Sequence, residues 1–182
     1  MLIYYENISY NKGFSLIELM ITIAIAAIVM GIGIPGFVQV IKNNRLATNA
    51  NELISSINLA RSEAIKRNVR VFVERNGGSS SNWDSGWNVF IDLNSNNTYN
   101  SGTDTLLKTY PALSNNYTLR TGANYANWIS FLPSGLINSS SGTNNDSFRL
   151  CATAGDTVNS RKITINTVGR ARISSGDVAS CP

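Results

Sequence analysis

The residues best suited to chemistry in this sequence are two arginines in the segment Gly169-Arg170-Ala171-Arg172. In a β-strand, Arg170 and Arg172 lie on one face, about 6.6 Å apart. Guanidinium groups at that spacing can each make a charge-assisted contact with neighbouring phosphates. Arg161 and Lys162 are close enough in sequence for the preceding predicted strand to widen the basic surface. The alternative is an exposed arginine pair on an edge strand that binds no ligand.

The composition excludes most classes of enzyme. The chain has 182 residues and no histidine, which removes Ser-His-Asp and Cys-His nucleophilic sites, HExxH zinc sites and imidazole acid–base catalysis. Paired carboxylates, a phosphate-binding loop and an activated nucleophile are not recognisable in the sequence. We therefore predict that the protein is not an enzyme and that it uses no cofactor.

The segment Asp92-Leu93-Asn94-Ser95-Asn96-Asn97 partly resembles a calcium-binding loop. It lacks the glycine at the sixth position and the glutamate at the twelfth position of such loops. We interpret it as a polar hairpin loop and predict no metal site.

The net charge of +4 is unevenly distributed along the chain. Between residues 76 and 107 the only ionisable side chains that carry charge are aspartates, namely Asp84, Asp92 and Asp104. From residue 149 onwards the cations outnumber the acids, with Arg149, Arg161, Lys162, Arg170 and Arg172 against Asp156 and Asp177. A local basic bias of this kind steers anionic partners more than the total charge does.

An apolar run extends from residue 14 to residue 41 and contains one ionisable residue, Glu18. It exceeds the roughly 20 apolar residues that cross a bilayer core. Lys12 precedes it, which favours a cytoplasmic N-terminus and a single membrane pass. A carboxylate within such a helix is unfavourable by about 2.5 to 3.5 kcal/mol and marks a function and a partner. Cleavage after Gly13 would free the amine of Phe14, which Glu18 of the same or a neighbouring subunit could neutralise.

The segment Lys12-Gly13-Phe14-Ser15-Leu16-Ile17-Glu18-Leu19 resembles the processing motif of type IV prepilins and type II secretion pseudopilins. The resemblance implies that residues 1–13 are a leader, which prepilin peptidase removes between Gly13 and Phe14 before it methylates Phe14. It also implies that Glu18 recruits and aligns each subunit in a filament. Residues 14–42 would then form the transmembrane and assembly helix.

Beyond this helix the sequence predicts an α+β fold with an antiparallel sheet. Apolar residues recur at helical spacing over residues 43–68, which predicts an amphipathic continuation of the same helix. Short alternating runs then predict a β-rich head over residues 69–182, with strands at 69–73, 87–91, 105–108, 128–131, 147–150, 162–165 and 170–173. Clusters of Gly, Ser and Asn at 76–82, 94–102 and 138–145 predict turns.

Cys151 and Cys181 are widely spaced and form no CxxC pair. In an exported chain, two distant thiols most simply form one disulfide, which adds about 3 to 4 kcal/mol in the chain-entropy model. Two buried free thiols are the alternative.

Several blocks of the head resemble the GspH/FimT family of minor pilins and pseudopilins. They are residues 59–67, 83–92, 131–135, 148–151 and 168–172, in the order that the family has them. The resemblance implies the pilin fold, in which a long helix packs on an antiparallel sheet. The segment at 169–172 is similar to the GRxR motif by which FimT-type minor pilins bind DNA.

We therefore expect a minor type IV pilin that binds double-stranded DNA non-specifically for uptake in natural transformation. Its other partners would be major and minor pilins, prepilin peptidase and the inner membrane, with the head in the periplasm and later in a cell-surface pilus. A structural minor pilin that primes assembly without DNA and a GspH-like pseudopilin of type II secretion are the alternatives.

Overall fold

The structure of the protein is a computed structural model that describes residues 13–114, 116–153, 155–176 and 180–181. The chain divides into two compact units, residues 1–41 and residues 42–182. One helix, α1 (Leu16–Arg67), contributes residues to both units. Residues 1–12 of the predicted leader lie outside the described residues.

The later part of α1, from Lys42 onwards, has an apolar stripe. Its buried side chains recur three or four positions apart and are Leu46, Ala50, Leu53, Ile57, Ala60 and Ala64. The helix ends at Arg67, because Asn68 takes a left-handed conformation with a φ of 57°. The N–H of Val69 then donates to the carbonyl of Ala64 at 3.3 Å, as in a Schellman cap. This cap delays the first strand, which begins at Val71 rather than at the predicted residue 69.

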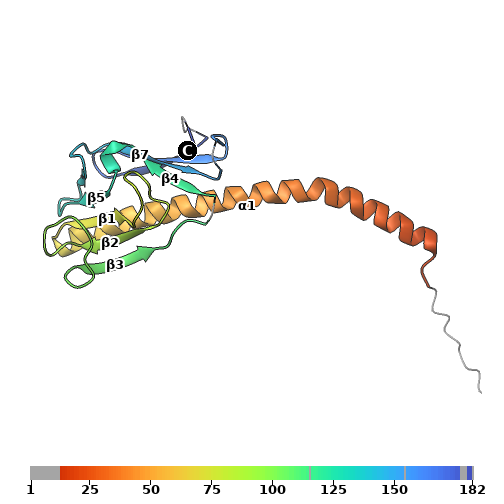
Figure 1. The fold of residues 1–182 in the computed structure, drawn as a ribbon, viewed down its shortest axis with the longest axis horizontal. Helices are drawn as coiled ribbons and strands as arrows, with labels where there is room; N and C mark the ends of the chain where they lie inside the picture. Colours follow the sequence, from red (N-terminus) through yellow and green to blue (C-terminus); the bar gives the residue numbers. More distant parts are fainter. Residues whose placement is uncertain (1–12, 115, 154, 177–179, 182) are drawn as a thin grey trace, which may run out of the picture. The chain divides into compact units, whose positions relative to one another are not determined.

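The described strands of the second unit form two antiparallel sheets (Figure 1). The five-stranded sheet has the order β3-β2-β1-β5-β6, and the four-stranded sheet has the order β4-β7-β8-β9. The strands of the first sheet are β1 (Val71–Arg75), β2 (Trp87–Ile91), β3 (Thr105–Tyr110), β5 (Trp128–Phe131) and β6 (Ile137–Ser139). Those of the second sheet are β4 (Thr118–Thr121), β7 (Asp146–Cys151), β8 (Ser160–Ile165) and β9 (Ala171–Ser175), and the short 3-10 helix η1 (Ala123–Tyr125) follows β4.

Both sheets contribute buried side chains to one core with the helical stripe. The first sheet supplies residues such as Val73, Val89 and Ile129, and the second supplies Leu119, Phe148, Leu150, Ile163 and Ile165. This core extends along the chain from Leu46 to Ile165. A chain that begins at Lys42 therefore keeps every buried residue of this core.

The α+β fold with antiparallel sheets is confirmed, and the structure corrects three further details of the prediction. Strands β4 and β6 were not predicted, because both are short and rich in polar residues. The first two residues of the turn predicted at 138–145 belong to β6. Strand β9 begins at Ala171, so Arg170 belongs to the preceding turn and not to the strand.

Candidate functional site

The start of α1 is stabilised by a hydrogen bond from its own sequence. The Oγ of Ser15 accepts from the N–H of Glu18 at 3.2 Å, and Leu19 donates to the carbonyl of Ser15 at 3.2 Å. Ser15 is therefore the N-cap, and Glu18 occupies the third helical position, as in a Ser-x-x-Glu capping box. A carboxylate in the first turn also compensates the positive end of the helix dipole. The Ser15–Glu18 spacing in the sequence signals this local role of Glu18, which was not predicted.

The apolar part of α1 is long and apolar enough to cross a membrane. An 18-residue window of the helix has a mean hydropathy of 2.4, and none of it is buried by protein. Phe14, directly before the helix, is exposed over 82% of its surface. An apolar surface of this kind needs lipid or other protein to cover it.

The turn between β8 and β9 holds Gly169 and Arg170. The N–H of Gly169 donates to the Asn166 carbonyl at 2.8 Å, and the N–H of Arg170 donates to Asn166 Oδ1, also at 2.8 Å. Asn166 in turn donates its own N–H to the carbonyl of Arg170 at 3.1 Å. Three hydrogen bonds to one asparagine therefore fix the backbone from which the Arg170 side chain extends into solvent.

Arg170 and Arg172 line a common cavity of about 360 Å³. The other lining residues are Thr164, Asn166 and Ala171. Arg170 lies in the turn and Arg172 lies in β9, and both side chains are exposed. The two guanidinium groups can thus act on one bound anion or on two neighbouring ones.

The two residues predicted to widen this surface lie on opposite faces of β8. Lys162 pairs with Arg149 of β7 and Ser174 of β9, and it shares the outer face with Arg172. Arg161 lies on the core side of β8, as Ile163 does, and is half-buried. Its Nη1 donates to the carbonyl of Ser160 at 2.8 Å. Lys162 is therefore on the same face as Arg172, and Arg161 is not.

Two further arginines lie on the outer face of the four-stranded sheet and were missing from the predicted site. Arg149 stands directly opposite Lys162, and Arg120 of β4 stands directly opposite Arg149. Arg149 donates to the Oγ of Ser180 at 3.2 Å. The sequence signalled Arg149 only as part of the C-terminal basic bias, and it gave no signal for Arg120 because β4 was not predicted.

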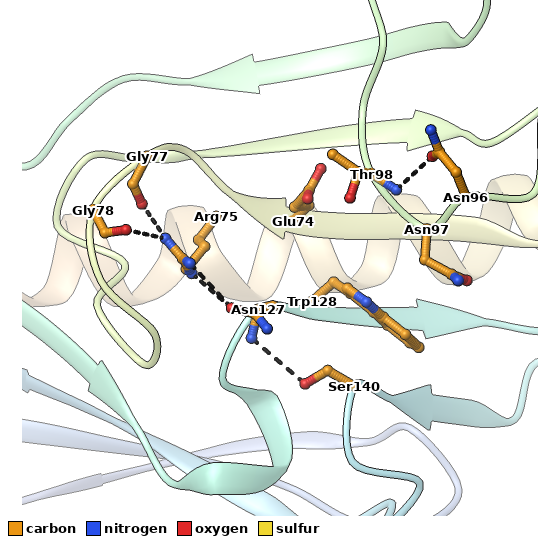
Figure 2. Close-up of a pocket in the computed structure, with 10 residues that line it drawn as sticks. All are labelled: Glu74, Arg75, Gly77, Gly78, Asn96, Asn97, Thr98, Asn127, Trp128 and Ser140. Atoms are coloured by element: carbon orange, nitrogen blue, oxygen red, sulfur yellow. Dashed lines mark hydrogen bonds between the residues drawn. The ribbon is translucent and has the colours of Figure 1, made fainter.

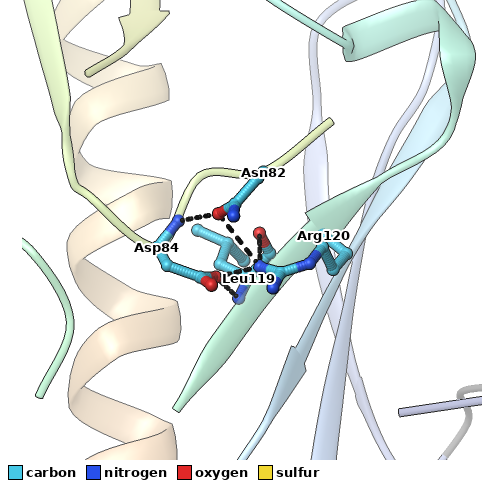
Figure 3. A network of polar contacts seen from close by, with 4 residues as sticks. All are labelled: Asn82, Asp84, Leu119 and Arg120. Atoms are coloured by element: carbon cyan, nitrogen blue, oxygen red, sulfur yellow. Dashed lines mark hydrogen bonds and ion pairs between the residues drawn. The ribbon is translucent and has the colours of Figure 1, made fainter. Parts of the chain in front are cut away.

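Asp84 neutralises Arg120 at the edge of this face (Figure 3). The Asp84 carboxylate accepts from the Arg120 guanidinium and from the N–H of Leu119 at 2.6 Å. The Oδ1 of Asn82 accepts from Arg120 at 3.0 Å and from the N–H of Asp84 at 2.9 Å. These contacts tie the loop before β2 to strand β4 and reduce the positive charge at this end of the sheet.

The predicted disulfide between Cys151 and Cys181 is present. It attaches the C-terminal end of the chain to the last residue of β7. The carbonyl of Cys181 also accepts from the N–H of Gly155 at 3.0 Å. In the same loop, backbone and side-chain hydrogen bonds from Asn159 hold the pKa of Asp156 below its ordinary value. The loop and the C-terminal end therefore support each other beside the outer face.

Two family models match this chain. The model for type II transport protein GspH matches residues 49–169, which is well over half of the sequence. The model for the prokaryotic N-terminal methylation motif matches residues 8–34, the segment that contains Gly13, Phe14 and Glu18. The chain is a type IV pilin-like protein of the GspH/FimT family.

Individual relatives agree with this assignment. The pilin-like chain is 32% identical over 98 residues to pilin-like protein PilA1 of Thermus thermophilus, a match that covers 50% of this chain and 55% of PilA1. It thus spans about half the length of that relative. Its fold is similar to the type IV minor pilin FimU of Pseudomonas aeruginosa, with a TM-score of 0.61 at 21% identity over 76% of this chain and 96% of FimU. A second crystal form of FimU gives a TM-score of 0.58 over 75% and 100% of the two chains.

The family models confirm the predicted resemblance to type IV pilin-like proteins, and the similarity to FimU confirms the pilin fold. The methylation motif and the apolar part of α1 together support membrane anchoring and association with a pilus.

A polar pocket of the pilin-like head lies between the loops after β1 and β2 (Figure 2). Arg75 spans it and donates to the carbonyl of Gly78 at 3.0 Å and to Asn127 Oδ1 at 3.0 and 3.2 Å. Glu74 accepts from the N–H of Tyr99 at 2.7 Å, and burial raises the pKa of Glu74 above its ordinary value. Arg75 thus ties the loop after β1 to Asn127, and Glu74 ties β1 to the loop after β2, so both side chains support the loops around the pocket.

The loop at 92–104, which partly resembles a calcium-binding loop, is held by its own aspartates. Asp92 accepts from the N–H groups of Ser95 and Asn97, each at 2.7 Å. Asp104 accepts from the N–H groups of Leu93 and Asn100 at 3.0 and 2.8 Å. Both carboxylates therefore close the backbone of the loop on itself.

The aromatic residues that could stack on bases are mostly engaged elsewhere. Tyr125 is fully buried and Tyr117 is 8% exposed. The Trp128 ring packs edge-on against Phe72, and the Arg70 guanidinium lies 5.2 Å from the Trp128 ring centroid. Any anion-binding role of the head consequently falls on its cations.

Proposed function

We propose that this protein is a minor pilin that assembles into a type IV pilus and binds duplex DNA non-specifically, for uptake in natural transformation. The observation that carries the proposal is the common cavity lined by Arg170 and Arg172, at the exposed end of an edge strand. The family model ends at residue 169, so the support for these two arginines is their geometry and charge.

Arginine is well suited to this role because its guanidinium forms two parallel hydrogen bonds with a phosphate. Contacts to phosphates do not depend on base sequence. They release counterions, so the logarithm of the affinity falls by about 0.9 per phosphate for each tenfold rise in salt. A site of two to four cations predicts binding in the micromolar range at physiological salt.

Maturation supplies the assembly surface in this proposal. Prepilin peptidase cleaves between Gly13 and Phe14 and methylates the new amine, and the head then lies in the periplasm. The positive amine of Phe14 lies just before the helix N-terminus, where the helix dipole is also positive. The nearby carboxylate of Glu18 compensates both positive charges. In the filament, Glu18 pairs with the Phe14 amine of its own or a neighbouring subunit and aligns the stack. The other pilins and the inner membrane are therefore the remaining partners.

A pseudopilin of type II secretion is the second candidate, because the matching family is described as type II transport protein GspH. A structural minor pilin without DNA binding is the third. The operon that contains the gene separates the first two, since pilus genes and secretion genes form different clusters.

The deciding experiment for DNA binding is a mobility shift with a short duplex and the head from Lys42 onwards, which keeps the whole core. We expect a shift that weakens with salt and a loss of at least about tenfold in affinity for the Arg170→Gln/Arg172→Gln variant. Arg45→Gln/Lys108→Gln, which removes two exposed cations from α1 and β3, is the charge-matched control. Equal binding by wild type and Arg170→Gln/Arg172→Gln at low salt would reject the DNA function and favour the structural pilin.

Processing is tested separately, by mass spectrometry of the membrane-bound protein from cells with active prepilin peptidase. We expect a chain that begins at a methylated Phe14. We also expect Glu18→Gln to be processed but to be left out of filaments. A chain with an intact leader would contradict the proposed maturation.

A further inference from the structure

We infer that the outer face of the four-stranded sheet is a phosphate-binding track, along which the duplex crosses from β9 to β7 over Arg172, Lys162 and Arg149. This inference rests on the proposed DNA-binding function and extends it from the turn to a defined path. It adds Arg149 as a binding residue and gives the direction of the DNA, across the strands.

The strand register brings these cations together. Lys162 and Arg149 are direct cross-strand partners, which sets their Cβ atoms about 5 Å apart. Arg172 pairs with Thr164, so it lies diagonal to Lys162, at about 7 to 8 Å. The cations therefore form a continuous path from the turn at Arg170 to the middle of the sheet.

The strand positions on this face carry no negative charge. Side chains alternate between the two faces of a strand, so the outer-face positions follow from the register with the buried positions. They are Thr118, Arg120, Ser147, Arg149, Cys151, Ser160, Lys162, Thr164, Arg172 and Ser174. Apart from the disulfide cysteine, every one is a cation or a hydroxyl residue. Ser160 and the hydroxyl of Thr118 are buried, whereas Thr164 is exposed and its hydroxyl can bond to a phosphate. These strand positions contain no carboxylate and no large apolar side chain.

The energetics of this face point to an anionic occupant. Like charges that lie directly opposite each other across two strands are destabilising. In the row Arg120, Arg149 and Lys162, Asp84 pairs with Arg120, and Arg149 donates to the neutral hydroxyl of Ser180. A polyanion that crosses the face places opposite charge beside both Arg149 and Lys162, which are direct cross-strand partners. The track accordingly ends at Arg120, where the protein supplies its own carboxylate.

The test measures duplex affinity at several salt concentrations with the head from Lys42 onwards. For Arg149→Gln/Lys162→Gln we expect a salt slope that is smaller by about 1.8, because two phosphate contacts are lost. Between about 50 and 200 mM salt, the wild type should then lose roughly tenfold more affinity than this variant. Arg45→Gln/Lys108→Gln removes the same charge elsewhere and should keep the wild-type slope. Arg149→Lys keeps the charge and should retain most of the affinity, and thermal melts check that each variant folds.

The outcomes separate the track from the turn. If Arg170→Gln/Arg172→Gln weakens binding while Arg149→Gln/Lys162→Gln behaves like the control, the track is wrong and the proposed function stands. If only Arg149→Gln/Lys162→Gln weakens binding, the turn is wrong, and so is the track as stated, because Arg172 belongs to it. A wild-type head that binds no duplex at low salt overturns both. If polyglutamate of matched charge displaces the duplex as well as unlabelled duplex does, the face binds acidic protein segments and DNA is the wrong occupant.

Discussion

A Cβ atom added to Gly169 would stand 2.7 Å from Cε1 of Phe131, a buried core residue. Gly169 also has a φ of 76°, in the left-handed region that favours glycine. The turn that presents Arg170 is therefore packed directly onto the core of the head. This contact explains why a glycine precedes the arginine, independently of any family motif.

Replacement of Gly169 by alanine should destabilise the head and displace Arg170. The left-handed backbone alone disfavours alanine by about 1 to 2 kcal/mol. The clash with Phe131 adds to this, because the ring is buried and has little room to move. Urea unfolding of Gly169→Ala should show the combined loss.

Gly142 provides a matched control for this substitution. Its φ is 80°, and a Cβ there would meet nothing within 4 Å. Gly142→Ala should therefore show the backbone contribution alone. Equal losses of stability in Gly142→Ala and Gly169→Ala would contradict the packing argument.

The Asp84–Arg120 contact should stabilise the junction between the loop before β2 and strand β4. Asp84→Ala leaves the N–H of Leu119 without its acceptor and removes the carboxylate from Arg120, which keeps the Oδ1 of Asn82. The unfolding free energy should fall by about 1 to 3 kcal/mol. Asp84→Asn keeps an oxygen acceptor for the N–H of Leu119 and should lose less. Chemical denaturation of both variants measures the difference, and an Asp84→Asn variant as unstable as Asp84→Ala would show that the charge matters more than the acceptor.

The disulfide should be the largest single contribution to stability near the C-terminus. Opening it in a Cys151→Ser/Cys181→Ser variant should reduce the unfolding free energy by about 3 to 4 kcal/mol and lower the Tm by about 10 °C. Thermal melts of wild type with and without reductant should differ by a similar amount. Reductant should leave the Tm of the variant unchanged, and a reductant effect on the variant would mean that the loss has another origin.

Residue patterns were sufficient to predict the helix, the class of the fold and the disulfide. The stripe from Leu46 to Ala64 reports burial directly, because its side chains face the core at the helical period. Strands β2 and β5 are buried almost throughout, and their apolar and aromatic residues signal them. Strands β4 and β6 escaped prediction because each is too short and polar to signal a strand alone. Each forms through its pairing with a neighbouring strand, β7 for β4 and β5 for β6. Long-range pairing of that kind is absent from any local window of sequence.

The candidate site was predictable in its residues but not in its arrangement. Arg161, Lys162, Arg170 and Arg172 were proposed from charge and spacing alone. Their distribution over a turn and two faces depends on where β9 begins and on the register with β8. Arg149 lies beside Lys162 only because β7 pairs with β8 in this register, and the register cannot be derived from the sequence alone.

Glu74 should make stability depend on pH in a defined direction. Its carboxylate accepts from the N–H of Tyr99, yet burial dominates and raises the pKa of Glu74 above its ordinary value of 4.5. The folded state therefore binds more protons than the unfolded state as the pH rises from about 4.5 through the raised pKa. In this window the contribution of Glu74 to the unfolding free energy falls with rising pH, and it is fully present only below 4.5.

Glu74→Gln keeps an oxygen acceptor for Tyr99 and removes the titration. Urea unfolding between about pH 4 and 7 should thus show the stability of Glu74→Gln rising relative to wild type across the window and levelling off above it. A difference that is flat or falls with pH would contradict the raised pKa.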